Sequence, residues 1–153
     1  MEKEIKRIDK LFIRLMHDWS LPTLRISLAI VFLWFGELKI LGVSPVVDLL
    51  QHSYSFFPEP AFVTILGIWE IIIGITLFFN ITLRFALALL WLQMAGTLFA
   101  PLLNWSLFFN KGNIFLLTIQ GEFIVKNLVL IASSLVIGGF ALEKEETPHD
   151  EKT

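Results

Sequence analysis

Residues 25–39, RISLAIVFLWFGELK, begin with a cation and end with an acid and a cation, with eleven uncharged residues between Arg25 and Glu37. They belong to a largely apolar run over 21–41. A helix of that length is about 31 Å long, because the rise is about 1.5 Å per residue. The hydrocarbon core of a bilayer is about 30 Å thick. The run therefore predicts a membrane-spanning helix that holds Glu37 and Lys39 at membrane depth.

An ionisable side chain at that depth costs about 2.5–3.5 kcal/mol on insertion scales, so it needs a partner from another helix. Glu37 and Lys39 stand two positions apart, which places them on opposite faces of a helix. We expect Lys39 to face the protein interior and Glu37 to point toward the rim.

The composition favours an integral membrane protein of one domain. Of 153 residues 56% are hydrophobic, 15 are Phe and five are Trp, and the mean hydropathy is +0.74. A soluble domain is nearer 45–50% apolar, as a rough average. The sequence has no basic patch interleaved with aromatic residues of the kind that would suggest nucleic-acid binding. The lack of cysteine excludes disulfides, thiol relays, iron–sulfur clusters and Cys-ligated zinc. We expect no metal, no intrinsic cofactor and no catalytic motif.

Four segments are apolar and long enough to cross a bilayer, so the predicted fold is all-α, an integral membrane four-helix bundle. The segments are 21–41, 61–79, 82–103 and 122–142. Residues 80–82 leave room only for a tight link between the second and third. We assign 21–142 to the membrane domain and 143–153 to a charged, disordered tail.

Residues 1–20 predict a separate amphipathic helix. Its apolar residues recur at steps of three and four, as on one helix face: Ile5, Ile8, Phe12, Leu15 and Trp19. Such a helix can lie on an anionic membrane surface, or it can pack on its own bundle as a solvated helix. Pro22 suits the first turn of the next helix.

Lys and Arg concentrate near the two ends of the chain, which predicts that both termini are cytoplasmic. The segments 42–60 and 104–121 are then outer loops. In the first, the run from Ser44 to Phe57 predicts a short capped helix closed by Pro58 and Pro60. We expect both loops to lie in or near the outer membrane interface.

Because successive spans run in opposite directions, their polar residues converge on the outer half of the bilayer. The candidate ligand-binding residues there are Lys39, Glu70, Gln93, Lys126 and Asn127. Glu70 is the deepest acid, and we expect it to pair with a lysine or to be protonated and donate a hydrogen bond. Glu122 and Lys126 form an i,i+4 pair in the favourable order.

Structural readings of the same residues stay open. Ion pairs that only hold four helices together would give the same pattern. Arg25 and Arg84, at the cytoplasmic ends of their spans, are further candidates for ligand contact, but such residues commonly reach for lipid phosphates. The stripe of Gly67 and Gly74 is more typical of close helix packing than of a ligand niche.

Several short motifs occur in an order that resembles a known family. They are Arg25, Phe32, Gly36 and Lys39; Gly67, Glu70 and Gly74; Arg84; GVSPVV at 42–47; and FIVKN at 123–127. Over about residues 22–140 the chain resembles the DoxX-like family of small four-helix membrane proteins, closest to its YkgB-like branch. The basic N-terminal helix and the acidic tail depart from that pattern.

The resemblance implies a location and a setting, but it brings no catalytic motif. Members include a subunit of a thiosulfate:quinone oxidoreductase and proteins linked to defence against oxidants, including reactive chlorine species. It implies a multi-pass protein of the bacterial inner membrane, with a redox-protein partner or further copies of the chain beside it. Carried over by position, its polar residues are Arg25, Lys39, Glu70, Arg84 and Lys126.

The leading hypothesis is an accessory subunit that binds a quinone-like or lipid ligand in membrane redox or oxidative-stress physiology, without autonomous catalysis. Lys39 and Lys126 would polarise a head-group oxygen, and Glu70 would donate or accept a hydrogen bond or exchange a proton. Gln93 and Asn127 would orient the ligand. The alternatives are a small proton-coupled transporter, which would need oligomers, and a structural membrane scaffold.

Overall fold

The computed structural model describes residues 2–44 and 61–146, without the side chains of 2–3 and 142–146. The short capped helix predicted after Ser44 and the last part of the tail lie outside these residues. The elements in chain order are α1 (Glu2–Ile40), α3 (Ala61–Phe79), α4 (Leu83–Leu103), α5 (Trp105–Phe108), the 3₁₀ turn η1 (Asn110–Gly112) and α6 (Ile119–Glu146). The described residues contain no strand, so the all-helical prediction is confirmed for them.

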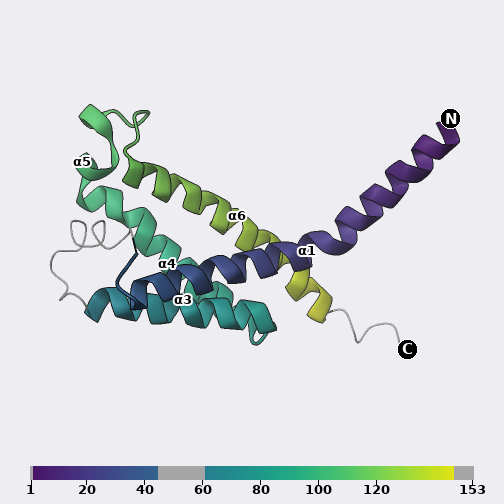
Figure 1. Cartoon of the computed structure of the whole chain (residues 1–153), viewed down its shortest axis with the longest axis horizontal. Helices are drawn as coiled ribbons and strands as arrows, with labels where there is room; N and C mark the ends of the chain where they lie inside the picture. The colour runs from purple at the N-terminus through teal and green to yellow at the C-terminus, as the bar shows by residue number, and fades with distance from the viewer. Residues whose placement is uncertain (1, 45–60, 147–153) are drawn as a thin grey trace.

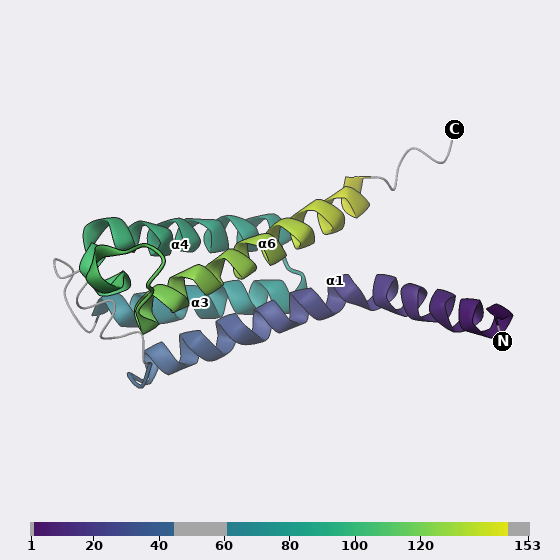
Figure 2. The same ribbon diagram turned by 90° about the horizontal axis from the view of Figure 1, so that it is seen from above.

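The four long helices, α1, α3, α4 and α6, are each long and apolar enough to cross a membrane. They pack side by side, with α4 and α6 inclined to α1 and α3 in Figure 1, and the start of α1 and the end of α6 lie at the same end of the bundle, away from α5 (Figures 1 and 2). The predicted tight link between the second and third spans is confirmed. It spans Asn80–Thr82, and both of these residues have positive φ, 56° and 45°.

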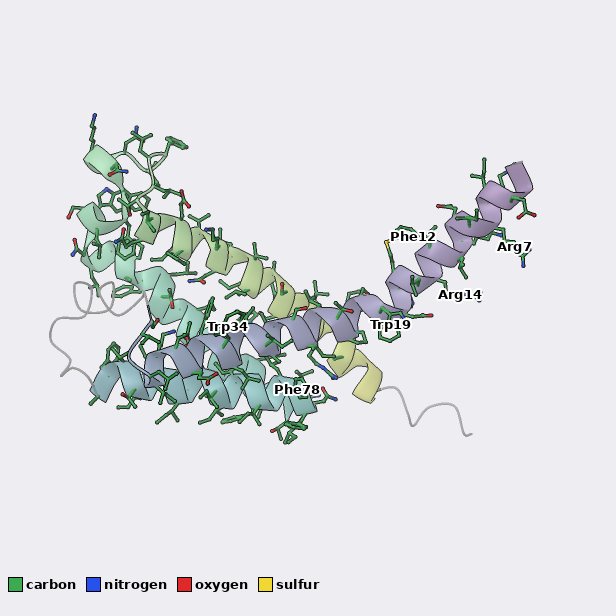
Figure 3. All side chains as sticks on the ribbon, in the orientation of Figure 1. Arg7, Phe12, Arg14, Trp19, Trp34 and Phe78 are labelled. Carbon is green, nitrogen blue, oxygen red and sulfur yellow. The ribbon has the colours of Figure 1, made fainter. Side chains whose placement is uncertain are left out.

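The predicted break before Pro22 is wrong. Helix α1 runs without interruption from Glu2 to Ile40, with Pro22 inside it. A proline within a helix removes one hydrogen bond and crowds the carbonyl four residues earlier, which can bend the helix without ending it. The helix axis changes direction near Trp19, within one turn of Pro22 (Figure 3).

The N-terminal part of α1 projects from the bundle. Residues 4–20 are all exposed, and Arg7, Phe12, Arg14 and Trp19 lie along this projecting part (Figure 3). The alternative that this segment packs on its own bundle is therefore contradicted. A separate N-terminal helix is not confirmed either, since the segment is continuous with the first span.

Helix α6 is longer than predicted at both ends. It covers Ile119–Glu146, whereas the sequence predicts a span over 122–142 and a disordered tail from 143. Glu and Lys are good helix formers, so the charged residues 143–146 can continue the helix beyond its apolar part. The first four residues of the predicted tail are therefore helical.

All four long helices contribute to one buried apolar core. Its members include Leu28, Ala29 and Phe32 from α1, Ile73 and Leu77 from α3, Ala86, Leu90 and Met94 from α4, and Ile137 from α6. Large apolar side chains also cover the outside of the bundle: Trp34 is 62% exposed and Phe78 is 43% exposed (Figure 3). An apolar exterior of this kind is expected of helices surrounded by lipid.

Helices α1 and α3 meet through glycines. A Cβ added at Gly36 would lie 2.6 Å from the Gly67 carbonyl oxygen, and one added at Gly67 would lie 2.8 Å from the Gly36 carbonyl oxygen. Only glycine allows two helix backbones to approach this closely. The packing role predicted for the glycine stripe is confirmed, and this close seam sets the distance between the polar side chains described next.

Candidate functional site

The centre of the candidate site is a buried ion pair between two helices. Lys39 Nζ lies 2.6 Å from Glu70 Oε2, and both side chains are only 7% exposed. Lys39 is in the last turn of α1, and Glu70 is in the middle of α3. The two helices are antiparallel and helical side chains tilt toward their own N-terminus, so these two side chains lean toward each other. The expectation that Glu70 pairs with a lysine is confirmed.

Gln93 of α4 brings a third helix to the same carboxylate. Its Nε2 donates a hydrogen bond of 2.5 Å to Glu70 Oε1. An ionised carboxylate can only accept hydrogen bonds, so the Gln93 side chain turns its amide nitrogen toward Glu70 and its amide oxygen away from it. The Gln93 Oε1 atom is buried and has no hydrogen-bond partner among the described residues. Lys39, Glu70 and Gln93 are called the polar cluster below.

Aromatic rings surround the polar cluster. Lys39 Nζ lies 6.0 Å from the centre of the Phe35 ring, at the limit for a cation–π contact. Trp69, next to Glu70 in α3, donates from its Nε1 to the Leu89 carbonyl oxygen at 3.2 Å. That bond fixes the indole ring against α4. The cluster is therefore held among flat apolar surfaces.

A cavity of about 340 Å³ lies among α1, α3, α4 and α6, and the three residues of the polar cluster are in its wall. Most of the remaining wall is apolar, with Phe32, Phe35 and Trp69 among its members. Gly96 of α4 also lines it, and a Cβ added there would meet nothing within 4 Å. An apolar cavity of a few hundred Å³ with a few convergent polar groups is typical of a small-molecule site, whose usual range is about 300–1,000 Å³.

Two further polar residues line the cavity, one on α6 and one on α4. Asn127 of α6, a predicted site residue, lines it, as does Thr97 of α4. The Thr97 hydroxyl donates to the Gln93 carbonyl oxygen at 2.9 Å, one turn earlier in the same helix. The sequence therefore placed Lys39, Glu70, Gln93 and Asn127 correctly around one space.

Lys126 does not join them in the wall of the cavity. Its side chain is 70% exposed and lies 3.8 Å from the carboxylate of Glu122, which is 60% exposed. It also stands over the Phe123 ring at 5.4 Å from the ring centre. Adjacent helix positions differ by about 100° in direction, so an inward Asn127 turns Lys126 to the outside.

The two predicted arginines lie apart from the cavity, and neither contributes to its wall. Arg25 is half-buried, and its Nε is buried without a hydrogen-bond partner in the described part of the chain. Arg84 is exposed in the first turn of α4. Glu37 is exposed as well, as its phase relative to Lys39 predicts.

Thr97 shares a helix face with Gln93 in the sequence pattern but was not among the candidate ligand-binding residues, and Gly96 was given no role. Both carried a usable signal, because they lie three and four positions after Gln93 and so share its helix face. No three His, Asp or Glu side chains of the described residues gather as metal ligands would.

The chain matches no protein-family model, and no curated protein or solved structure matches it. The site's chemistry therefore rests on its own geometry. The polar cluster can hydrogen-bond a ligand group, and the aromatic wall can cover a flat or aliphatic body.

Proposed function

We propose that this protein binds a quinone-like or lipid ligand inside the membrane and acts as an accessory subunit in membrane redox or oxidative-stress physiology. The observation that carries the proposal is an apolar cavity of about 340 Å³ with a buried ion pair and an amide in its wall. Buried charges cost free energy even when paired. A bundle that only needed to be stable would be served as well by apolar residues there.

In this proposal each residue has a role that follows from its position in the cavity wall. Lys39 polarises an oxygen of the ligand, Glu70 holds the ammonium group in place, and Gln93 fixes the carboxylate. Asn127 contacts the ligand from α6, and Thr97 contacts it from α4, one turn beyond Gln93. Lys126, which the sequence pattern had placed beside Lys39, has no part in it.

The cellular setting rests on the resemblance to the DoxX-like family. That resemblance supports a multi-pass protein of the bacterial inner membrane with a redox-protein partner or further copies of itself. The start of α1 and the end of α6 lie at one end of the bundle, which is compatible with both termini being cytoplasmic.

A structural scaffold is the second candidate, and one observation favours it. The polar cluster connects three helices, α1, α3 and α4, through two hydrogen bonds to one carboxylate. In that case the cavity has no ligand and the cluster serves only to fix the helix positions.

Extraction of bound molecules from protein purified in native-lipid nanodiscs separates the two. We expect mass spectrometry to find a stoichiometric quinone or specific lipid with wild type and with Glu122→Gln, and at least a tenfold loss with Glu70→Gln. Glu122→Gln is the matched control, since it removes an exposed acid of the other lysine pair. An empty wild-type cavity, or equal occupancy in all three proteins, would leave the scaffold as the better account.

A further inference from the structure

Over the described residues, the wall of the cavity is electrically balanced. Lys39 and Glu70 are the ionisable residues in this described wall, and they are paired with each other at 2.6 Å. The remaining polar groups of the wall, Gln93, Thr97 and Asn127, are neutral. A ligand that enters therefore meets one positive and one negative charge that already compensate each other.

This balance works against a charged ligand. An ion moved from water into an apolar cavity loses its hydration, and only an opposite charge without another partner can replace it. Here Glu70 already compensates the positive charge of Lys39. A carboxylate, a phosphate or an ammonium group in the cavity would remain uncompensated, whereas a neutral group would not.

The spare hydrogen-bonding groups of the cluster point to the kind of neutral ligand. An ammonium group has three N–H donors, and among the described residues Lys39 uses one toward Glu70. Both carboxylate oxygens of Glu70 already accept a bond, one from Lys39 and one from Gln93. Lys39 therefore keeps two N–H donors, for which a carbonyl oxygen is the neutral acceptor. Gln93 Oε1, buried without a hydrogen-bond partner among the described residues, is a spare acceptor of the cluster and would accept from a hydroxyl or N–H of the ligand.

We infer that the cavity selects uncharged ligands that carry a carbonyl oxygen, bound by Lys39, and that it rejects amphiphiles with an ionic head group. The inference rests on the proposed function and narrows its ligand class. Two sources share this chemistry: the ring carbonyl of a quinone and the ester carbonyl of a neutral glycerolipid. The rings of Phe32, Phe35 and Trp69 in the wall suit the flat ring better.

The test compares four probes on the full chain in nanodiscs made of zwitterionic lipid. The neutral probes are decylubiquinone and dioleoylglycerol, and the ionic ones are oleate and dodecyltrimethylammonium. Retained probe per protein is measured after gel filtration, with empty nanodiscs as the blank. We expect wild type to retain a neutral probe at least tenfold better than either ionic probe. Higher retention of decylubiquinone than of dioleoylglycerol identifies the quinone ring carbonyl as the bound group, and the reverse order identifies the ester carbonyl.

Charge variants make the inference falsifiable in a second way. Glu70→Gln leaves Lys39 as an unpaired cation, so the oleate retained per protein should rise at least tenfold over wild type. The double variant Lys39→Met with Glu70→Gln makes the wall neutral again and should lose that gain in oleate. Gel-filtration profile and far-UV circular dichroism report whether each variant is folded, and if one is not, the ranking of the four probes on wild type decides alone.

The failures of the two proposals are distinguishable. Wild type that retains oleate as well as decylubiquinone, or a Glu70→Gln variant with unchanged oleate retention, overturns the charge selectivity but leaves a ligand site. Wild type that retains none of the four probes, and yields no bound molecule on extraction, overturns the proposed function itself.

Discussion

Two lysine–carboxylate pairs of the described residues have surroundings that differ sharply. Lys39 and Glu70 belong to different helices, lie 2.6 Å apart and are each 7% exposed. Glu122 and Lys126 belong to one helix, lie 3.8 Å apart and are 60% and 70% exposed. The first pair borders a cavity, and the second faces away from the bundle.

The comparison teaches that the depth of a residue along the membrane normal and its chemical type are not enough to place it in a ligand site. An exposed pair contributes about 0–1 kcal/mol, because its charges are screened and its side chains lose entropy. Breaking a buried pair by removing one partner costs about 3–5 kcal/mol, because the other charge is left uncompensated. The two pairs should therefore respond very differently to the same substitutions.

The largest effect is expected from Lys39→Met. It leaves the Glu70 carboxylate buried without its cation, so the free energy of unfolding in mild detergent should fall by about 3–5 kcal/mol. Adding Glu70→Gln to this variant removes the stranded charge and should restore most of the loss. Thermal unfolding of the single and double variants measures the difference; equal stability of the two would show that the pair is not buried as described.

The smallest effect is expected from Lys126→Met. Exposed substitutions of this kind usually change stability by less than about 0.5 kcal/mol. Retention of decylubiquinone should equal that of wild type, because Lys126 does not line the cavity. A variant that loses the ligand while keeping its stability would return Lys126 to the site and remove the distinction between the two pairs.

The sequence predicts the spans well because apolar length is a strong signal. The second predicted span, 61–79, coincides with α3. The pairing of Lys39 with Glu70 was also within reach, since the two spans are antiparallel and side chains that tilt toward their own N-termini lean toward each other along the membrane normal. Both predictions depend on position along the membrane normal, which sequence order supplies.

Rotation about a helix axis is harder to predict, and Lys126 shows why. Helix α6 carries apolar residues on every side, so its pattern does not say which face turns inward. Asn127 and Lys126 are neighbours in sequence, and packing alone assigns one to the cavity and the other to the exterior. The helix break predicted before Pro22 was wrong for a related reason. Proline prefers the first turn of a helix, but this local preference did not end a helix that continues on both sides of it. The cavity itself depends on side-chain packing and leaves no direct trace in the sequence.

The most direct test of the central claim fills the cavity without touching the polar cluster. Gly96→Leu adds a side chain to the cavity wall, whereas Gly139→Leu adds the same side chain on α6 outside the cavity wall; a Cβ meets nothing within 4 Å at either position. Occupancy by the extracted ligand should fall at least tenfold in Gly96→Leu and stay at the wild-type level in Gly139→Leu, with equal thermal midpoints. Equal occupancy in the two variants would contradict the claim that this cavity holds a ligand.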